Sequence, residues 1–248
     1  MADSGIKLLE TENLTKRFGG LTAIDDLSLS IQEGEIRGII GPNGSGKTTL
    51  MNLISGLYKA TSGAIYLDGN RIDQLKPNVR TSKGIIRTFQ IPKVFRDMTV
   101  LENMLVPALS DSQGDRYKQR VEIVDQAQEL LQFVQLSHME NRSAKTLSGG
   151  QNQLLQIARG FMIKPLRIYL MDEPFAGVNP QIKSVIMESI KEMNREKGIT
   201  FIVVSHEMPS IRRLCDTVTV IHEGRCIAEG TLEKVAHVPA VIDAYIGG

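Results

Sequence analysis

Residues 41–48 of this chain read Gly41-Pro42-Asn43-Gly44-Ser45-Gly46-Lys47-Thr48. The stretch fits the phosphate-binding pattern G-x-x-x-x-G-K-[ST] at every fixed position. Glycines let the backbone turn tightly, so that successive N–H groups can point at the phosphates of a nucleotide. Residues 35–40 read as a buried strand that leads into this loop, and residues 49–54 as the helix that leaves it. The pattern predicts a binding site for a nucleoside triphosphate, to which the lysine adds a positive charge and the threonine a hydroxyl for Mg²⁺.

A second element lies at residues 167–173, an apolar run that ends in Asp172 and Glu173. Buried parallel strands have this composition, and ligands of α/β proteins bind at the carboxyl ends of such strands. We expect Asp172 to hold Mg²⁺ through water, and Glu173 to act as the general base that orients and deprotonates an attacking water. Without the phosphate loop, two acids after a strand would indicate only a solvated turn.

A third element, Leu-Ser-Gly-Gly-Gln at residues 147–151, comes directly before a predicted helix. The apolar residues of that helix recur at helical spacing; they are Leu154, Leu155, Ile157, Ala158, Phe161 and Met162. Ser148 is a suitable N-cap, and a helix start needs neither the two glycines nor Gln151. Two glycines at a helix N-terminus allow an anion to approach closely.

These three elements, in this order, resemble the ATP-binding-cassette (ABC) ATPase family, and the resemblance covers nearly the whole chain. It implies an α/β fold of the P-loop NTPase type, with a RecA-like α/β core, an antiparallel β subdomain and an inserted helical subdomain. We expect a single ABC ATPase domain over residues 1–248. The core and the β subdomain would occupy residues 1–90 and 163–248, and the helical subdomain about 91–162.

The resemblance implies ATP and Mg²⁺ as cofactors, with two cassettes packed head to tail. Each ATP would lie between the phosphate loop of one subunit and the Leu-Ser-Gly-Gly-Gln signature of the other. The implied nucleotide-binding residues are Phe18, Gly41, Pro42, Asn43, Gly44, Ser45, Gly46, Lys47, Thr48, Thr49, Ser148, Gly149, Gly150 and Gln151. The implied metal-binding residues are Thr48, Gln90 and Asp172. The signature residues would touch the γ-phosphate that the partner binds.

Further roles follow from the family's motifs. Gln90 matches the Q-loop glutamine, which contacts Mg²⁺ and the attacking water, and His206 matches the switch histidine at the γ-phosphate. The implied catalytic residues are therefore Glu173, His206 and Gln90. Phe18 matches an aromatic that stacks on adenine, although an aromatic beside a strand is usually part of the core. Asn179 stands where the family's D-loop usually has Asp, a loss of charge that puts communication between subunits in question. We still expect an active ATPase.

Composition limits the alternatives. A chain of 248 residues has room for one α/β domain and a smaller helical one, and a net charge of +1 gives no general reason to expect nucleic-acid binding. No apolar stretch is as long as a membrane helix, and residues 1–5 do not read as a signal peptide. Cys215 and Cys226 lack metal-ligand spacing, which favours a reduced, cytosolic pair.

The segment from Gln74 to Arg96 has basic residues and no acidic ones. The basic residues are Lys76, Arg80, Lys83, Arg87, Lys93 and Arg96. Two interpretations stay open: a surface that faces the membrane or the loops of a permease, and an ordinary solvated face.

Several stretches resemble the ATPases of branched-chain amino acid importers; they are residues 16–23, 87–90, 98–103, 176–180 and 238–247. The resemblance implies an ATPase subunit that powers the import of branched-chain, hydrophobic amino acids from the cytoplasmic face of the inner membrane. The implied partners are a second ABC ATPase, identical or related, two transmembrane permeases and, through them, an extracytoplasmic substrate-binding protein. No nucleic acid is expected.

Other functions stay open. Closely related cassettes serve uptake of urea or short amides, and another relative drives lipopolysaccharide export. A soluble ABC protein of translation or DNA repair is a rival, but such proteins generally carry two cassettes or a long coiled-coil insertion, and this chain has neither. A nucleotide-gated module without turnover is a further rival, against which the Asp172-Glu173 pair and His206 argue.

Overall fold

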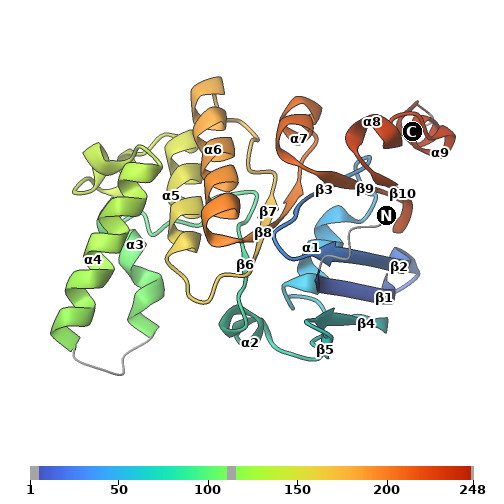
Figure 1. Ribbon diagram of the computed structural model, residues 1–248, viewed down its shortest axis with the longest axis horizontal. Coiled ribbons are helices and arrows are strands. Elements are labelled where there is room, and N and C mark those ends of the chain that lie inside the picture. Colours follow the sequence, from blue (N-terminus) through green and yellow to red (C-terminus); the bar gives the residue numbers. More distant parts are fainter. Residues whose placement is uncertain (1–5, 111–115, 247–248) are drawn as a thin grey trace.

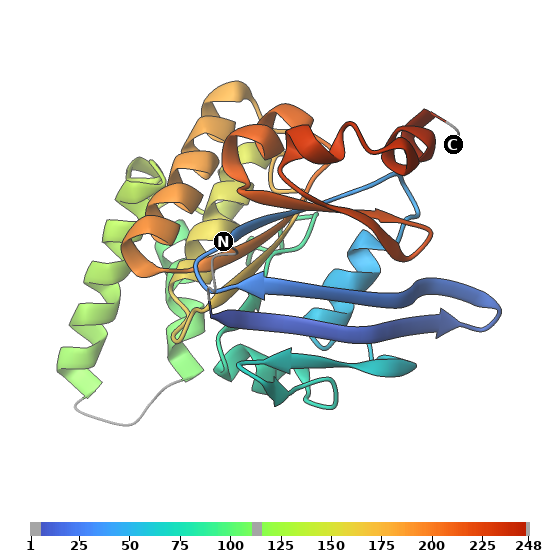
Figure 2. The same cartoon turned by 45° about the vertical axis from the view of Figure 1, so that its right-hand side comes forward.

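The structure, a computed structural model, describes residues 6–110 and 116–246, and the strands of this part form two sheets (Figures 1 and 2). The strands are β1 (Lys7–Phe18), β2 (Leu21–Gln32), β3 (Ile36–Ile40), β4 (Ser62–Leu67), β5 (Asn70–Arg71), β6 (Ile85–Arg87), β7 (Ile168–Asp172), β8 (Thr200–Val204), β9 (Thr217–His222) and β10 (Arg225–Gly230). One sheet is antiparallel, in the order β2-β1-β4-β5. The other has the order β10-β9-β3-β8-β7-β6 and is parallel except at β10. The predicted α/β fold, with an antiparallel sheet beside a parallel core, is confirmed.

The helices gather mainly on one side of the parallel sheet (Figure 1). They are α1 (Lys47–Ile54), α2 (Pro77–Ser82), α3 (Val100–Leu105), α4 (Arg116–Phe133), α5 (Gly149–Phe161), α6 (Pro180–Lys197), α7 (Met208–Leu214), α8 (Leu232–Val235) and α9 (Pro239–Ile246). Short 3₁₀ turns are η1 (Val106–Ser110), η2 (Ser137–Met139) and η3 (Ala144–Thr146). In the part of the chain that the structure describes, no helix is both long and apolar enough to cross a bilayer.

The longest helix of the predicted helical subdomain, α4, begins at Arg116, in a mostly polar stretch that lacks apolar residues at helical spacing. Arginine, lysine and glutamine are good helix formers, so the missing apolar spacing did not prevent a helix there. The helix ends at Phe133, because Gln135 takes a left-handed conformation with φ of 60°. Residues 111–115 lie outside the described part, as do residues 1–5, where no signal peptide was expected.

The parallel sheet is buried on both faces, as its apolar strands predicted. Every residue of β3, β7 and β8 is buried. Along β7, Tyr169 and Met171 face a core shared with α3, α4, α5 and α6, whereas Ile168 and Leu170 face a second core shared with α1 and the antiparallel sheet. A strand that must fill two cores cannot alternate apolar and polar residues, which explains its continuous apolar run.

The register of the sheet places the motif residues at one edge. Ile39 of β3 and Asp172 of β7 both lie opposite Val204 of β8. The residues that follow these strands therefore leave the sheet side by side. They belong to the phosphate loop, to the Asp172-Glu173 pair and to the Ser205-His206 pair.

Two arginines of the basic segment are buried, so neither interpretation of that segment applies to them. The Arg80 side chain is 1% exposed and donates to the carbonyl oxygens of Leu53 (2.5 Å) and Ile54 (2.8 Å) at the end of α1. A cation there also interacts favourably with the negative end of the dipole of α1. Arg87 is held inside by Asp172, as described below. The exposed positive residues of this segment are Lys76, Lys83, Lys93 and Arg96.

We predict that Arg80→Ala lowers the free energy of unfolding by about 2–4 kcal/mol, because each buried carbonyl left without a donor costs roughly 1–3 kcal/mol. Urea unfolding followed by circular dichroism measures the change. The control is Lys83→Ala, because Lys83 is exposed and follows the last residue of α2, the helix that carries Arg80. This variant should change stability by less than about 0.5 kcal/mol. Equal stability of the two variants would contradict a structural role for Arg80.

Candidate functional site

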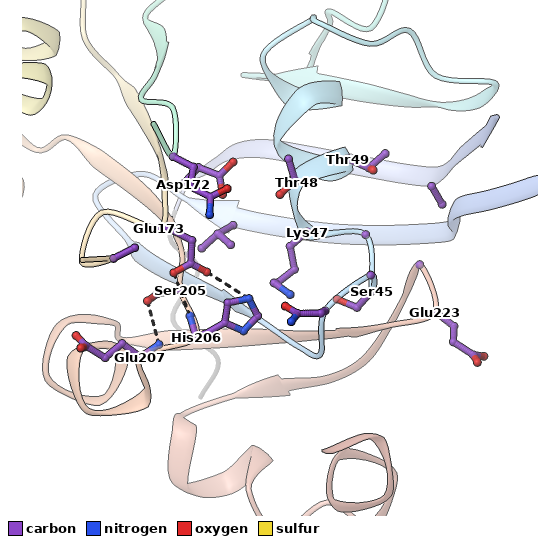
Figure 3. Close-up of a pocket in the computed structure, with 18 of the residues that line it drawn as sticks. Ser45, Lys47, Thr48, Thr49, Asp172, Glu173, Ser205, His206, Glu207 and Glu223 are labelled. Carbon is purple, nitrogen blue, oxygen red and sulfur yellow. Dashed lines mark hydrogen bonds and ion pairs between the residues drawn. The ribbon is translucent and has the colours of Figure 1, made fainter. Parts of the chain in front are cut away.

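A cleft of about 1100 Å³ lies at the carboxyl edge of the parallel sheet (Figure 3). The phosphate loop supplies one wall, and residues that follow β7 and β8 supply the opposite wall. The sequence-predicted residues that line it are Phe18, Asn43, Gly44, Ser45, Gly46, Lys47, Thr48, Thr49, Gln90, Asp172, Glu173 and His206. The predicted residues in this one cavity are thus up to 188 positions apart, from Phe18 to His206.

The phosphate loop is built to bind an anion. The Lys47 ammonium donates to the carbonyl oxygens of Gly41 and Pro42, at 2.8 Å each, and its burial lowers its pKa although Glu173 and Asp172 oppose the shift. The hydroxyl of Ser45 is buried without a hydrogen-bond partner in the described structure. No side chain caps the N-terminus of α1, so the amides of its first turn keep their donors for a ligand.

Two glycines of the loop are required by close backbone contacts. A Cβ on Gly41, where φ is 148°, would lie 2.0 Å from the carbonyl oxygen of Ile221. A Cβ on Gly46, where φ is 109°, would lie 2.5 Å from the carbonyl oxygen of Ala23. The loop therefore rests directly on the end of β9 and on β2, which fixes its shape.

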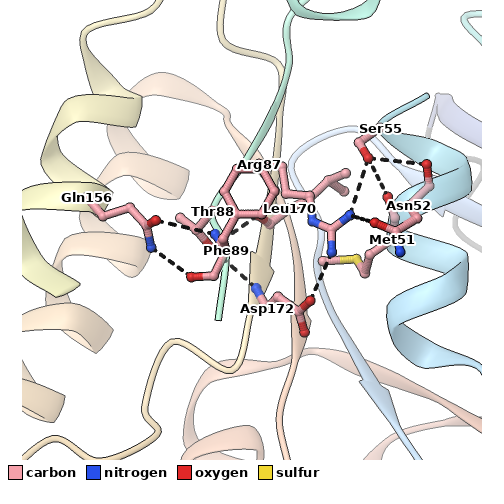
Figure 4. A network of polar contacts seen from close by, with 9 residues as sticks. All are labelled: Met51, Asn52, Ser55, Arg87, Thr88, Phe89, Gln156, Leu170 and Asp172. Carbon is pink, nitrogen blue, oxygen red and sulfur yellow. Dashed lines mark hydrogen bonds and ion pairs between the residues drawn. The ribbon is translucent and has the colours of Figure 1, made fainter. Parts of the chain in front are cut away.

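Asp172 is 4% exposed and forms a buried ion pair with Arg87, whose Nη2 lies 2.9 Å from its Oδ2 (Figure 4). The second terminal nitrogen of the guanidinium group, Nη1, donates to Oδ1 of Asn52 on α1 at 2.5 Å. Arg87 joins the metal-binding candidate to the helix of the phosphate loop. The sequence did not predict that Arg87 pairs with Asp172. Arg87 belongs to both the basic segment and the loop motif of residues 87–90, and neither pattern indicates which distant residue it contacts.

Glu173 has the properties of a general base. Its side chain is 13% exposed, and burial raises its pKa although His206 pulls in the other direction. Nε2 of His206 lies 3.4 Å from Oε1 of Glu173, and the backbone N–H of His206 donates to Oε2 at 3.4 Å. Oε1 is buried and accepts no hydrogen bond, so it can take one from a water. A raised pKa makes the Glu173 carboxylate a stronger base than an ordinary glutamate, which favours proton abstraction.

Three oxygen-bearing side chains in the cleft fit Mg²⁺: those of Thr48, Gln90 and Asp172. Mg²⁺ prefers oxygen ligands and usually takes one or two carboxylates together with substrate phosphates and water. The described residues include no group of three or more His, Cys, Asp or Glu that could hold a metal by themselves. The donor set therefore suits an ion that arrives with a nucleotide.

Phe18 is not part of the core, the alternative that its sequence context allowed. It is 41% exposed and lines the cleft. Tyr58 meets its ring edge-on with 5.3 Å between centroids, and Nζ of Lys16 lies 4.8 Å from its centroid. Sequence reasoning missed Tyr58, because no local pattern links it to a residue forty positions earlier.

The signature residues do not line this cleft. Ser148 caps α5 as predicted, but Gln151 is also used: Gln151 N–H donates to Ser148 Oγ (3.3 Å), and Ser148 N–H donates to Gln151 Oε1 (2.9 Å). The expectation that the helix start does not need the glutamine was wrong. Gly150 packs on Ile182, with 2.6 Å between an added Cβ and Cδ1, whereas a Cβ on Gly149 would meet nothing within 4 Å. The chain's own packing thus does not require a glycine at position 149.

Asn179, the departure from the usual D-loop, caps α6. Its side-chain oxygen accepts from the N–H of Ile182 at 2.9 Å. Asn and Asp are about equally good N-caps. The substitution therefore leaves the helix start intact.

Sequence reasoning also missed Lys183 and Glu207, which line the cleft and form an ion pair with each other. The N–H of Glu207 donates to the hydroxyl of Ser205 at 3.1 Å (Figure 3). These contacts tie the turn that carries His206 to α6. The Ser-His-Glu run was visible in the sequence, but the position of Lys183 depends on packing between α6 and α7.

The profile of the ABC transporter family matches residues 24–176. A probable branched-chain amino acid transport ATP-binding protein of Archaeoglobus fulgidus is 38% identical, over 98% of this chain and 96% of its own length. A high-affinity branched-chain amino acid transport ATP-binding protein of Pseudomonas aeruginosa is also 38% identical, over 97% and 98%.

Among solved structures, an ATP-binding cassette of an ABC transporter in its ADP conformation has a TM-score of 0.85 and 38% identity, covering 98% of this chain and 99% of its own. A dimeric ATP-binding cassette in a post-hydrolysis state with ADP and Pi has a TM-score of 0.81 and 30% identity, covering 91% and 99%.

The raised pKa of Glu173 predicts a pH-dependent effect of Glu173→Gln on stability. Since the folded protein binds this proton more tightly than the unfolded chain, ionisation destabilises the fold as pH rises through and above the ordinary glutamate range. Glutamine cannot ionise, so the variant should be more stable than the wild type at pH 7, and the difference should shrink below about pH 4. Urea unfolding across this range measures it. A difference between the variant and the wild type that does not change with pH would contradict the prediction.

Proposed function

This chain belongs to the ABC transporter family, and we propose that it is the ATP-hydrolysing subunit of an importer for branched-chain, hydrophobic amino acids. The observation that carries the hydrolytic part is the cleft of Figure 3, where the phosphate loop faces the acidic pair and the histidine. The amino acid substrate is supported by the names of relatives that match this chain over almost their whole length.

In the proposed reaction, the amides of residues 41–48 and the ammonium of Lys47 hold the phosphates of ATP. Glu173 takes a proton from a water that it orients together with His206, and the water oxygen attacks the γ-phosphorus as the bond to ADP breaks. Mg²⁺, held by Thr48, Asp172 and Gln90, would offset negative charge on the phosphates. Lys47 and Asp172 are buried, so water screens their interactions less than it would on an exposed surface.

The site is proposed to be completed by a second cassette. The signature residues are outside the cleft of their own subunit, and Ser148 and Gly149 are exposed. Gly149 has open space in front of it, which suits close approach of a partner's phosphate to the N-terminus of α5. We propose one cassette per chain, with the core and β subdomain in residues 1–90 and 163–248 and the helical subdomain at about 91–162.

The remaining partners follow from the family and the relatives. We propose that two transmembrane permeases bind this subunit at the cytoplasmic face of the inner membrane, and that an extracytoplasmic binding protein delivers the amino acid to them. The chain itself is peripheral in this assembly. Substrate selection then lies with the permeases and the binding protein.

We predict that Glu173→Gln slows phosphate release from ATP by about 10²–10⁴-fold, the usual contribution of a positioned base. Binding of a fluorescent ATP analogue should persist, since Lys47 and the loop are unchanged. Lys47→Ala should weaken that binding, and Glu223→Gln should leave both binding and turnover unchanged. Phosphate release by Glu173→Gln at the wild-type rate would exclude Glu173 as the base.

The transport assignment is tested by purification of the tagged chain from gently solubilised membranes of its native cell. We expect two permeases and a second cassette to co-purify. The binding protein associated with them should bind leucine, isoleucine or valine. Recovery from the soluble fraction alone, or with ribosomes or DNA, would overturn the transport function and leave the ATPase chemistry standing. A binding protein for urea or amides would overturn only the substrate.

A further inference from the structure

One glutamine of α5 holds the segment that carries Gln90. Oε1 of Gln156 accepts a hydrogen bond from the backbone N–H of Phe89 (3.4 Å), and its Nε2 donates to the carbonyl oxygen of Phe89 (3.0 Å) (Figure 4). Oε1 also accepts from the backbone N–H of Lys93 (3.2 Å). Gln156 is 4% exposed. The glutamine amide supplies both the acceptor for the two N–H groups and the donor to the carbonyl, whereas an ionised glutamate would set oxygen against the Phe89 carbonyl oxygen.

The same segment is held from the opposite side by the metal-binding candidate. Thr88 donates its N–H to the carbonyl oxygen of Leu170 (2.9 Å), and its hydroxyl accepts from the N–H of Asp172 (3.3 Å). Arg87 pairs with the Asp172 carboxylate at 2.9 Å and reaches α1 through Asn52. Both side chains of the Arg87–Asp172 pair are at most 7% exposed, so water competes little for these contacts.

The two sets of contacts are separated by very little chain. Arg87, Thr88 and Phe89 are consecutive, and the first two contact Asp172 while the third contacts Gln156. Such a short connection has almost no slack, and buried polar groups are costly to separate from their partners. A displacement of α5 must therefore either move Phe89 or break its hydrogen bonds with Gln156.

We propose that Gln156 is a positioning residue that fixes Phe89 and Gln90 relative to Asp172, and so couples the helix that starts at the signature to the Mg²⁺-binding side of the cleft. The inference rests on the proposed ATPase function and adds to it a residue outside the phosphate loop, the signature pentapeptide and the Asp-Glu strand. A merely structural role would predict lower stability alone. The positioning role predicts, in addition, a changed response to Mg²⁺.

The test compares two isosteric substitutions on the same helix, in the full-length chain. Gln156→Met removes the hydrogen bonds to Phe89 and Lys93. Gln153→Met is the matched control, because Gln153 is also 4% exposed and its Nε2 has no hydrogen-bond partner in the described structure. Binding of a fluorescent ATP analogue is titrated with Mg²⁺, and also measured with EDTA. Phosphate release provides kcat and KM as a separate readout.

We expect Gln156→Met to need about 3–10-fold more Mg²⁺ for half-maximal nucleotide binding. Removal of a group in direct contact with a metal ligand typically costs about 10–100-fold in metal affinity. The expected effect is smaller because Gln156 acts through Phe89 and Arg87. Its affinity without Mg²⁺ should equal that of the wild type. Gln153→Met should match the wild type in both measurements. Hydrogen exchange at Phe89 and Lys93 should be faster in Gln156→Met alone.

Should Gln156→Met fail to fold, Gln156→Glu serves as the second variant, since it keeps the oxygen that accepts from Phe89 and Lys93 and places a second oxygen against the Phe89 carbonyl. It should shift the Mg²⁺ dependence in the same direction. If a folded Gln156 variant needs no more Mg²⁺ than the wild type, the inference is wrong. ATP hydrolysis by the wild type would still support the proposed function in that case. A wild-type chain that binds no nucleotide would overturn both.

Discussion

Parallel pairing of β3, β8 and β7 forces the carboxyl ends of three buried strands to one edge of the sheet, and the cleft depends on that constraint. Because each strand fills a core on both faces, its side chains are committed to packing, and polar chemistry is possible only where the strands end. The phosphate loop, the acidic pair and the histidine occupy these ends. Their mutual distances are thus set by strand spacing and register, and not by the loops themselves.

Burial of charge is the second determinant of the site, and each buried charge has partners. Asp172 has Arg87, Lys47 has two loop carbonyls, and Arg80 has the carbonyls at the end of α1. Unpaired, these groups would cost several kcal/mol each, of the order expected for an uncompensated buried ion. Glu173 differs, since its Oε1 accepts no hydrogen bond and its pKa is raised. Among the described residues, the buried carboxylate oxygen without a hydrogen-bond partner thus belongs to the residue that the proposed chemistry uses.

The remaining contacts show how the two ends of the site are tied together. Gln156 joins α5 to Phe89, and Arg87 joins the same segment to Asp172. Gly149 and Ser148, at the exposed start of α5, are thereby connected to the floor of the cleft through a few polar groups. In the proposed dimer, this arrangement would link the signature of each subunit to the nucleotide site of that same subunit.

The sequence by itself determined the fold class, the strands that end at the site, the phosphate loop and the cap of α5 by Ser148. Each of these depends on residues that are close along the chain: hydrophobic periodicity, glycines that allow positive φ, and a side chain three residues from the amide it caps. It did not determine that Arg80 and Arg87 are buried, that Tyr58 touches Phe18, or that Lys183 pairs with Glu207. Nor did it determine the partners of Gln156. Those facts belong to the tertiary structure alone, because a side chain's partner across elements is chosen by packing and register, and no local pattern records which distant residue will satisfy it.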